Sequence, residues 1–233
     1  MSQRIVAAFD IGKKNFAFAV EKILASEIEG LRNCERETVI GHRKKKFQVI
    51  NPSHKFSRGE LLLLKNLDLT SNCDDKAYLD PKTYHNMTRV LDEYTEYWNM
   101  CDTIIIEQQM SFGRNKTNTM ALKLGQHCYS YFLVKYGETK LISEFPAYHK
   151  TQILRAPKKF GKIEKRYKNG KTTMIKDNLK KWSVRKATEV LKLRNDTKFQ
   201  DVLAAMKKKD DASDCILMIQ AKVLLDLCSD KNF

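Results

Sequence analysis

The sequence predicts an α/β fold: a single domain over residues 1–233, with a mixed five-stranded sheet flanked by helices. Two short apolar runs, 5–9 and 103–106, have the length of buried strands, and each is followed by a carboxylate. Segments with helical spacing of apolar residues alternate with strand-like runs in the second half, which predicts βαβ crossovers after an antiparallel start. Basic insertions are expected at about 42–80 and 155–200.

The N-terminal part has the pattern of an antiparallel meander. Strands are expected at 4–10 and 16–20, joined by a turn in which Gly12 allows a backbone conformation that a Cβ would obstruct. A short third strand is expected at 38–41. Residues 61–64 are four consecutive leucines, and so short a run is compatible with a strand or a helix.

The rest of the chain alternates helices and strands. Asp80 and Pro81 suit the N-cap and first position of a helix over 80–98. The all-apolar run ending at Glu107 is typical of a strand buried on both faces beside parallel neighbours. This order matches the ribonuclease-H-like architecture, in which the first strand is central. The remaining expected elements are a strand at 140–145 and helices at 119–136, 147–154, 182–193, 197–207 and 211–227.

The charge of the chain indicates a polyanionic partner. It carries 43 basic and 28 acidic residues, which gives a formal net charge of +15 and a pI near 9.5. Such a balance is typical of proteins that bind nucleic acid or another anionic surface, although a basic protein can also be merely soluble. No apolar run approaches the ~20 residues that span a bilayer, so no membrane association is expected.

The cysteines and the N-terminus favour an intracellular protein, cytoplasmic or nuclear. The six cysteines are widely scattered and form no C-x-x-C pair, so we expect free thiols rather than a zinc site. The N-terminal residues begin a strand pattern at once and show neither a secretion signal nor a transit peptide.

Four acidic residues stand where a two-metal nuclease would need them. Asp10 and Glu107 end strand-like runs, while Asp211 and Asp214, three residues apart, share one face of an expected helix. Mg²⁺ prefers oxygen ligands, and Mn²⁺ can substitute for it. Two such ions about 3.5–4 Å apart can activate a water and stabilise the leaving oxygen in phosphodiester hydrolysis. The constellation therefore predicts metal-dependent cleavage of a nucleic-acid backbone, with two ions per site.

Each of these acids also has a simpler explanation when taken alone. Asp10 before Gly12 could be a turn residue, and Glu107 could pair with a lysine. An Asp-x-x-Asp pair is commonly a solvated helix face, and Asp210 or Asp211 could cap the helix. The combination on these elements is more specific than any member. The Asp-x-x-Asp register favours Asp211 over Asp210 as the ligand.

The motifs around these acids resemble those of the RuvC-like Holliday junction resolvases, most closely their poxvirus-type and fungal mitochondrial branches. The resemblance covers roughly 1–22, 100–154 and 205–228. It implies a structure-specific endodeoxyribonuclease that resolves branched DNA, in particular four-way junctions, by paired phosphodiester hydrolysis. The matching stretches are Phe-Asp-Ile-Gly at 9–12, Ile-Glu-Gln-Gln at 106–109, Tyr-His-Lys-Thr-Gln at 148–152 and Asp-Ala-Ser-Asp at 211–214.

The same resemblance implies roles for individual residues. It implies that Asp10, Glu107, Asp211 and Asp214 ligate the metal ions. It also implies that Lys150 lies near the scissile phosphate, where a cation offsets developing negative charge. An ordinary surface lysine is the alternative for Lys150.

Two segments are candidates for DNA binding. The loop after Glu107 offers Phe112, Arg114 and Lys116, which could wedge at an opened base step and position phosphates. Residues 155–181 hold eleven basic and two acidic residues, a net charge of +9, and could follow the DNA backbone. A plain solvated loop and a disordered basic loop remain the alternatives. The cations proposed in the second segment are Lys158, Lys159, Lys162, Lys165 and Arg166.

A four-way junction is pseudo-twofold, so one active site per chain implies a homodimer. The helices at 80–98 and 119–136 are the candidate interfaces. Two other enzyme classes stay open: a ribonuclease H or transposase-like nuclease acting on other substrates, and a phosphate-binding ATPase, for which the chain lacks a second glycine-rich loop. A non-catalytic nucleic-acid binder is disfavoured because all four carboxylates are present.

Overall fold

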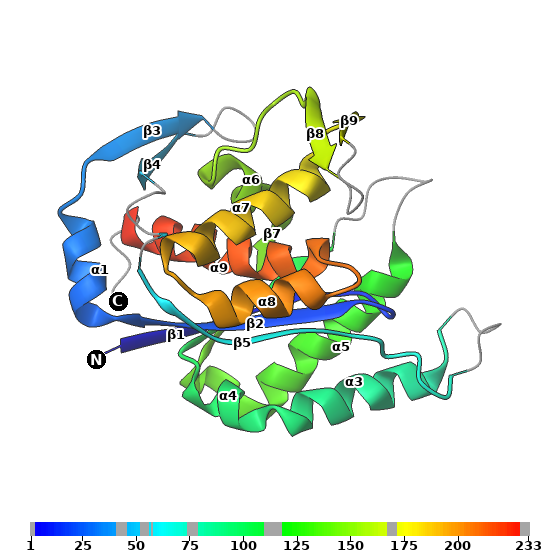
Figure 1. Ribbon diagram of the computed structural model, residues 1–233. Coiled ribbons are helices and arrows are strands. Elements are labelled where there is room, and N and C mark those ends of the chain that lie inside the picture. The colour runs from blue at the N-terminus through cyan, green and yellow to red at the C-terminus, as the bar shows by residue number, and fades with distance from the viewer. Residues whose placement is uncertain are drawn as a thin grey trace.

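The computed structural model describes residues 3–40, 46–51, 56, 58–73, 79–109, 118–166 and 172–228. A central sheet lies between two layers of helices (Figure 1). On one side are α3, α4 and α5, and on the other are α6, α7, α8 and α9. The helices are α1 (Ala25–Arg32), α3 (Pro81–Glu93), α4 (Thr95–Met100), α5 (Thr119–Tyr136), the 3-10 turn η2 (Gly137–Thr139), α6 (Ala147–Ile153), α7 (Leu179–Leu193), α8 (Thr197–Ala205) and α9 (Asp210–Cys228).

The predicted mixed five-stranded sheet with a central first strand is confirmed. Its strand order is β5-β2-β1-β6-β7. β1 pairs antiparallel with β2, and β2 pairs antiparallel with β5, whereas β6 and β7 continue the sheet in parallel. These are the order and directions expected of a ribonuclease-H-like fold. The strands are β1 (Gln3–Asp10), β2 (Phe16–Leu24), β5 (Glu60–Leu67), β6 (Thr103–Gln108) and β7 (Leu141–Pro146).

The third strand of the meander is not the one predicted. Residues 38–41 were expected to supply it, but β3 (Arg36–Ile40) pairs with β4 (Lys46–Ile50) in a separate two-stranded sheet. The leucine run instead forms β5, which pairs with β2. The physical reason is burial. Leu61 and Leu64 pack in one core and Leu63 packs in the other, so β5 contributes apolar side chains to both faces of the sheet.

β1 divides its side chains between two cores because successive strand residues point to opposite faces. Ile5, Ala7 and Phe9 pack in the core under α3, α4 and α5. Val6 and Ala8 pack in the core under α6, α7, α8 and α9. Every one of these side chains is buried, which explains why the run is apolar throughout rather than alternating.

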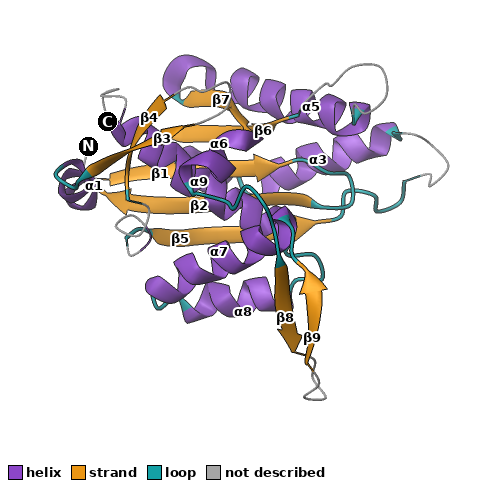
Figure 2. Cartoon of the chain, turned by 90° about the horizontal axis from the view of Figure 1, so that it is seen from above, coloured by secondary structure: helices purple, strands orange, loops and turns teal. Residues whose placement is uncertain are grey.

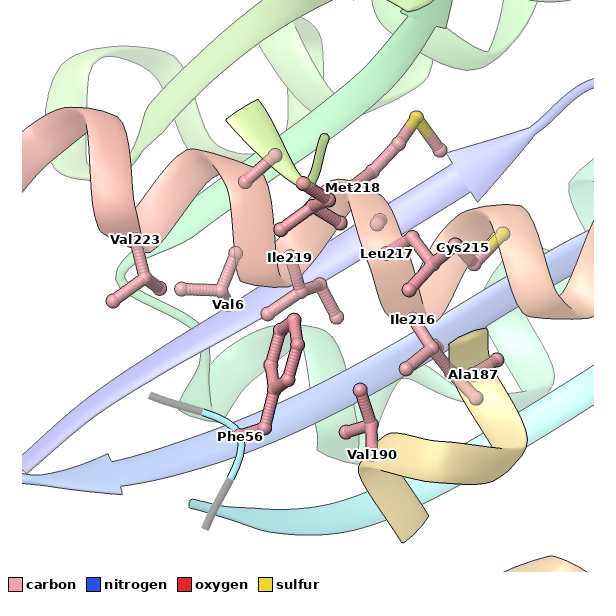
Figure 3. Packing of buried hydrophobic residues seen from close by; sticks show 14 of the residues in the cluster. Val6, Phe56, Ala187, Val190, Cys215, Ile216, Leu217, Met218, Ile219 and Val223 are labelled. Atoms are coloured by element: carbon pink, nitrogen blue, oxygen red, sulfur yellow. The ribbon is translucent and has the colours of Figure 1, made fainter. Parts of the chain in front are cut away.

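α9 is fixed to the sheet along most of its length. Its apolar face carries Ile216, Ile219 and Val223, which Figure 3 shows gathered with Val6 of β1 and Val190 of α7. All of these side chains are buried. A helix packed in this way holds its N-terminal turns at a defined place over the sheet.

The helix expected at 80–98 is divided in two. α3 ends and α4 begins at Tyr94, whose backbone leaves the helical region with φ −102° and ψ 20°. Asp80 caps α3 as predicted, accepting a hydrogen bond from the backbone N–H of Lys82 at 2.8 Å. The helix predicted at 119–136 is confirmed as α5.

The basic segment contains a β-hairpin that the sequence did not indicate. β8 (Lys162–Arg166) pairs antiparallel with β9 (Thr172–Lys176), and the hairpin projects from the body of the protein beside α7 (Figure 2). α7 begins earlier than expected because the side chain of Asn178 caps it. Its residues Ala187, Val190 and Leu191 are buried in the core with α9.

Cysteines 34, 73, 101, 128 and 215 carry free thiols, as expected. In the part of the chain that the structure describes, no helix is long and apolar enough to cross a lipid bilayer.

Candidate active site at the sheet edge

Asp10 and Glu107 lie side by side where β1 and β6 end. The two strands are parallel, with Phe9 opposite Ile106, so the following residue of each reaches the same edge of the sheet. A side-chain hydrogen bond joins the two carboxyl groups, and it tends to raise the pKa of Asp10 and to lower that of Glu107. Burial, followed by repulsion from Glu107 and Asp214, raises the pKa of Asp10 well above its usual range. Burial also raises the pKa of Glu107.

The N-terminal turns of α9 bring two further carboxylates to this edge. Ala212 and Cys215 are buried against the core, which leaves Asp211 and Asp214 at the margin of the sheet. Both carboxylates contribute to the raised pKa of Asp10. The structure therefore brings together the four acids that the sequence singled out.

The choice between Asp210 and Asp211 is decided by their neighbours. Lys180 of α7 binds Asp210 at 2.8 Å. Burial tends to raise the pKa of Asp210, but the hydrogen bond from Lys180, a backbone hydrogen bond and the attraction of Lys208 and Lys180 together lower it. The pKa of Asp211 is raised by burial despite its contact with Lys208. Asp211 contributes to the raised pKa of Asp10 while Asp210 lies against Lys180, so these contacts favour Asp211 as the member of the carboxylate cluster.

Lys150 lies among the carboxylates rather than on the helix surface. It belongs to α6, which starts immediately after β7, and only 3% of the residue is exposed. Its Nζ lies 2.8 Å from Oδ1 of Asp214 and 4.0 Å from Oε1 of Glu107. Burial lowers the pKa of Lys150, but the attraction of Asp214 and Glu107 outweighs this and the net pKa is raised. The ammonium group is therefore charged at neutral pH.

Sequence reasoning missed two lysines beside the cluster. Lys208 Nζ lies 2.5 Å from Oδ2 of Asp211, and Lys180 holds Asp210. The first contact had a local signal, because residues three apart at a helix start can pair. The second had none, since Lys180 and Asp210 meet only when α7 packs on α9.

The donor set fits a hard divalent cation in its chemistry. It consists of carboxylate oxygens, and the pKa of Asp10 is raised first by burial and then by repulsion from Glu107, Asp214 and Asp211. As the side chains stand, however, the described residues present no group of three or more ligands arranged to hold a metal ion. The reason is visible in the contacts: Lys150 and Lys208 neutralise Asp214 and Asp211, and Asp10 is bonded to Glu107. Metal binding would require Lys150 to move away from Asp214 and Lys208 to move away from Asp211.

The predicted DNA-binding residues lie partly outside the described residues. Phe112, Arg114 and Lys116 all do so. Lys158 and Lys159 are exposed on the segment that leads into β8, and Lys162 is exposed as the first residue of β8. Lys165 and Arg166 belong to β8, but their side chains lie outside the described part.

Comparison with known proteins finds relatives in two invertebrate iridescent viruses. The chain is 33% identical to uncharacterized protein 170L of Invertebrate iridescent virus 6 over 224 residues, which cover 93% of this chain and 87% of that protein. It is 27% identical to uncharacterized protein 97L of Invertebrate iridescent virus 3, over 93% of this chain and 98% of that protein. No protein-family model matches the chain.

Among solved structures, the chain is similar to Holliday junction resolvases at low identity. The fowlpox virus resolvase aligns over 94% of this chain and 96% of its own, with 16% identity and a TM-score of 0.44. Thermus thermophilus RuvC aligns over 92% of each chain, with 12% identity and a TM-score of 0.44. The yeast mitochondrial resolvase aligns over 96% of this chain and 82% of its own, with 12% identity and a TM-score of 0.44. By sequence, the chain belongs to the same family as protein 170L of Invertebrate iridescent virus 6.

Proposed function

We propose that the protein is a metal-dependent, structure-specific endonuclease that resolves branched DNA, with four-way junctions as its substrate. The observation that supports this most strongly is the convergence of four carboxylates and a buried lysine at one edge of the sheet. The five residues come from four elements that are far apart in the sequence, β1, β6, α6 and α9, so the fold brings them together. The net charge of +15 supports a polyanionic substrate. The preference for junctions rests on the motif resemblance.

The residues of the cluster have distinct chemical roles. Asp10, Glu107, Asp211 and Asp214 supply the oxygen ligands for Mg²⁺ or Mn²⁺, two ions per site. When bound, such ions supply an activated water and charge stabilisation at the leaving oxygen. Lys150 balances the buried negative charge and, once released from Asp214, directs its ammonium toward the scissile phosphate.

DNA binding is assigned to the basic segment and to the loop after Glu107. Lys158, Lys159 and Lys162 are exposed, and each phosphate that such a cation neutralises steepens the dependence of log K on log salt by ~0.9. A homodimer would present two cutting sites to a pseudo-twofold junction. The exposed side of α5 is the interface we favour, because Leu122 and Leu133 are both partly open to solvent there.

The test is cleavage of a synthetic four-way junction with Mg²⁺, against linear duplex, flap and RNA–DNA hybrid controls. We expect paired, symmetric nicks that a ligase can seal. Equal cleavage of linear duplex would reduce the protein to a general nuclease. Preferential cleavage of hybrids would favour a ribonuclease H or transposase-like enzyme, and ATP turnover without DNA cleavage would favour the ATPase alternative.

Two neighbouring substitutions make this test specific to the cluster. Asp211→Asn should abolish cleavage and leave junction binding intact, because a ligand is removed while repulsion of the phosphate falls. Asp210→Asn is the matched control and should retain cleavage, because Lys180 holds Asp210 outside the cluster. Isothermal titration with Ca²⁺ should show weaker metal binding for Asp211→Asn only. Equal effects of both substitutions would contradict the assignment.

A further inference from the structure

A groove of about 570 Å³ lies between the β8–β9 hairpin, the first turns of α7 and the segment that precedes α9. We call it the α7 groove. Its apolar lining includes Ile163, Ile175 and Val184, one from each of β8, β9 and α7. Its cations come from α7 and from the segment before α9: Lys180, Lys181, Arg185, Lys207, Lys208 and Lys209.

The α7 groove is also lined by two acids, Glu164 and Asp210, and it keeps a positive charge after these and its internal ion pairs are counted. Lys180 is bound by Asp210, and Arg185 is bound by Asp177 through two hydrogen bonds of 2.9 and 2.7 Å. Lys181 donates to the backbone carbonyl of Lys176, which leaves its charge in place. Among the described residues, no acidic side chain forms an ion pair with Lys181, Lys207 or Lys209.

The α7 groove opens onto the carboxylate cluster. Lys208 lines the groove, and its Nζ also contacts Asp211 at 2.5 Å. A second groove of about 550 Å³ shares Lys207 and Lys208 with the first, and continues to Lys14 and Asn15 in the turn between β1 and β2. The two grooves therefore meet at Lys207 and Lys208, beside Asp211 of the cluster, and the second groove also includes Asp68.

We propose that the α7 groove binds the sugar–phosphate backbone of the strand that is cut, on one side of the scissile phosphate. A polyanion fits the lysines that form no ion pair, and the apolar lining residues suit the sugar face of that backbone. A small anion would leave the apolar residues uncovered, whereas a strand covers the apolar and the cationic residues together. This inference rests on the proposed function, because it assigns a path to the substrate of the same site.

The first arm of the test measures junction binding in EDTA, where no cleavage occurs, for Lys181→Gln/Lys207→Gln. If both lysines bind phosphates, the slope of log K against log salt falls by ~1.8, and affinity at 0.1 M salt falls about eightfold for each lysine replaced. Lys192→Gln/Lys198→Gln is the matched control, since it removes the same charge from exposed positions at the other end of α7 and the start of α8. It should change the slope much less. Lys181→Arg/Lys207→Arg should restore the slope, because it keeps the charge.

The second arm locates the binding site on the DNA. Neutral methylphosphonates are placed one at a time along the strand on either side of the cut. At positions held by the α7 groove, each should weaken binding of the natural protein but not weaken the double glutamine variant further. The α7 groove assignment would be overturned if methylphosphonates at every position weakened binding of the double glutamine variant as much as binding of the natural protein, or if the control variant lost as much affinity as the double glutamine variant. In either case, junction cleavage by the natural protein would still support the proposed function. Absence of junction binding by the natural protein would overturn both.

Discussion

Lys150 of α6 forms an ion pair with Asp214 of α9, at 2.8 Å between Nζ and Oδ1, inside the cluster where Asp10 and Glu107 share a hydrogen bond. The lysine is almost fully buried. It therefore acts as an internal counter-ion for carboxylates that would otherwise repel one another across a low-dielectric space. The cluster is held by charge balance as well as by packing.

Replacing this counter-ion should destabilise the protein. Lys150→Met is expected to lower the free energy of unfolding by about 3–5 kcal/mol at pH 7 without divalent ions, because it leaves buried carboxylates uncompensated. Urea denaturation followed by circular dichroism measures this. Mg²⁺ should recover part of the loss in the variant. Lys82→Met, at an exposed position of α3, is the control; equal stability of the two variants would show that the ion pair contributes nothing.

The carboxylate cluster should also control how stability depends on pH. The pKa of Asp10 is higher in the folded protein than in the unfolded chain, so the folded state binds more protons. Stability is therefore lost as pH rises from the ordinary carboxyl pKa through the raised one. Asp10→Asn removes this loss and should raise the unfolding free energy at pH 7 relative to the natural protein.

Asp210→Asn should lower the free energy of unfolding at pH 7, which is opposite in sign to the effect of Asp10→Asn. The pKa of Asp210 is lowered in the folded state, so its ionised form stabilises the protein above the ordinary carboxyl pKa, and this contribution disappears as pH falls through the lowered one. Denaturant titrations between pH 4 and pH 8 compare both variants with the natural protein. If the unfolding free energies of all three proteins depended on pH in the same way, the pKa directions given for Asp10 and Asp210 would both be contradicted.

A second buried ion pair holds α7 to the sheet. Arg194 Nη2 lies 3.1 Å from Oε1 of the fully buried Glu21, and its Nε donates to the carbonyl of Phe56. Arg194→Leu should cost about 3–5 kcal/mol, because Glu21 keeps its charge but loses its cation. Adding Glu21→Gln should recover part of this loss, measured by urea denaturation. A double variant as unstable as the sum of the single changes would argue against the pair.

The opposite core depends on aromatic packing. The rings of Phe9 and Phe132 lie 5.1 Å apart, and both contact Trp98. Phe132→Ala should lower stability by about 3–5 kcal/mol through reduced burial and the resulting cavity. Val134→Ala on the same helix should change stability by less than ~0.5 kcal/mol, because Val134 is 88% exposed. Equal melting temperatures for Phe132→Ala and Val134→Ala would contradict this prediction.

The proposed dimer predicts a defined response to charge on α5. Leu122 and Leu133 are 39% and 40% exposed and lie eleven residues apart, on one face of the helix. Leu122→Glu/Leu133→Glu should raise the dimer dissociation constant at least tenfold, measured by light scattering over a concentration series. Ala204→Glu/Ala205→Glu, at exposed positions of α8 on the opposite side of the sheet, compares the effect of charge alone. A natural protein that is monomeric at every concentration would remove the dimer from the proposal.

Local patterns were sufficient for the elements that carry the site. Asp10 and Glu107 follow apolar runs whose length and composition identify buried strands, and Asp211 and Asp214 lie at helical spacing. Each of these relations lies within a single element, where backbone geometry sets the period. Local patterns failed for the third strand, because 38–41 and β5 both have strand composition. Only the pairing of β5 with β2 distinguishes them.

The sequence by itself determined the strand ends, the helix register and the excess of positive charge, because these follow from residue order and backbone geometry. Only the tertiary structure decided which charges meet. Lys150 enters the cluster because α6 and α9 pack together, and Lys180 reaches Asp210 because α7 packs on α9. Such contacts depend on the packing of elements far apart in the chain, and electrostatic energy depends on distance in space rather than on separation in sequence.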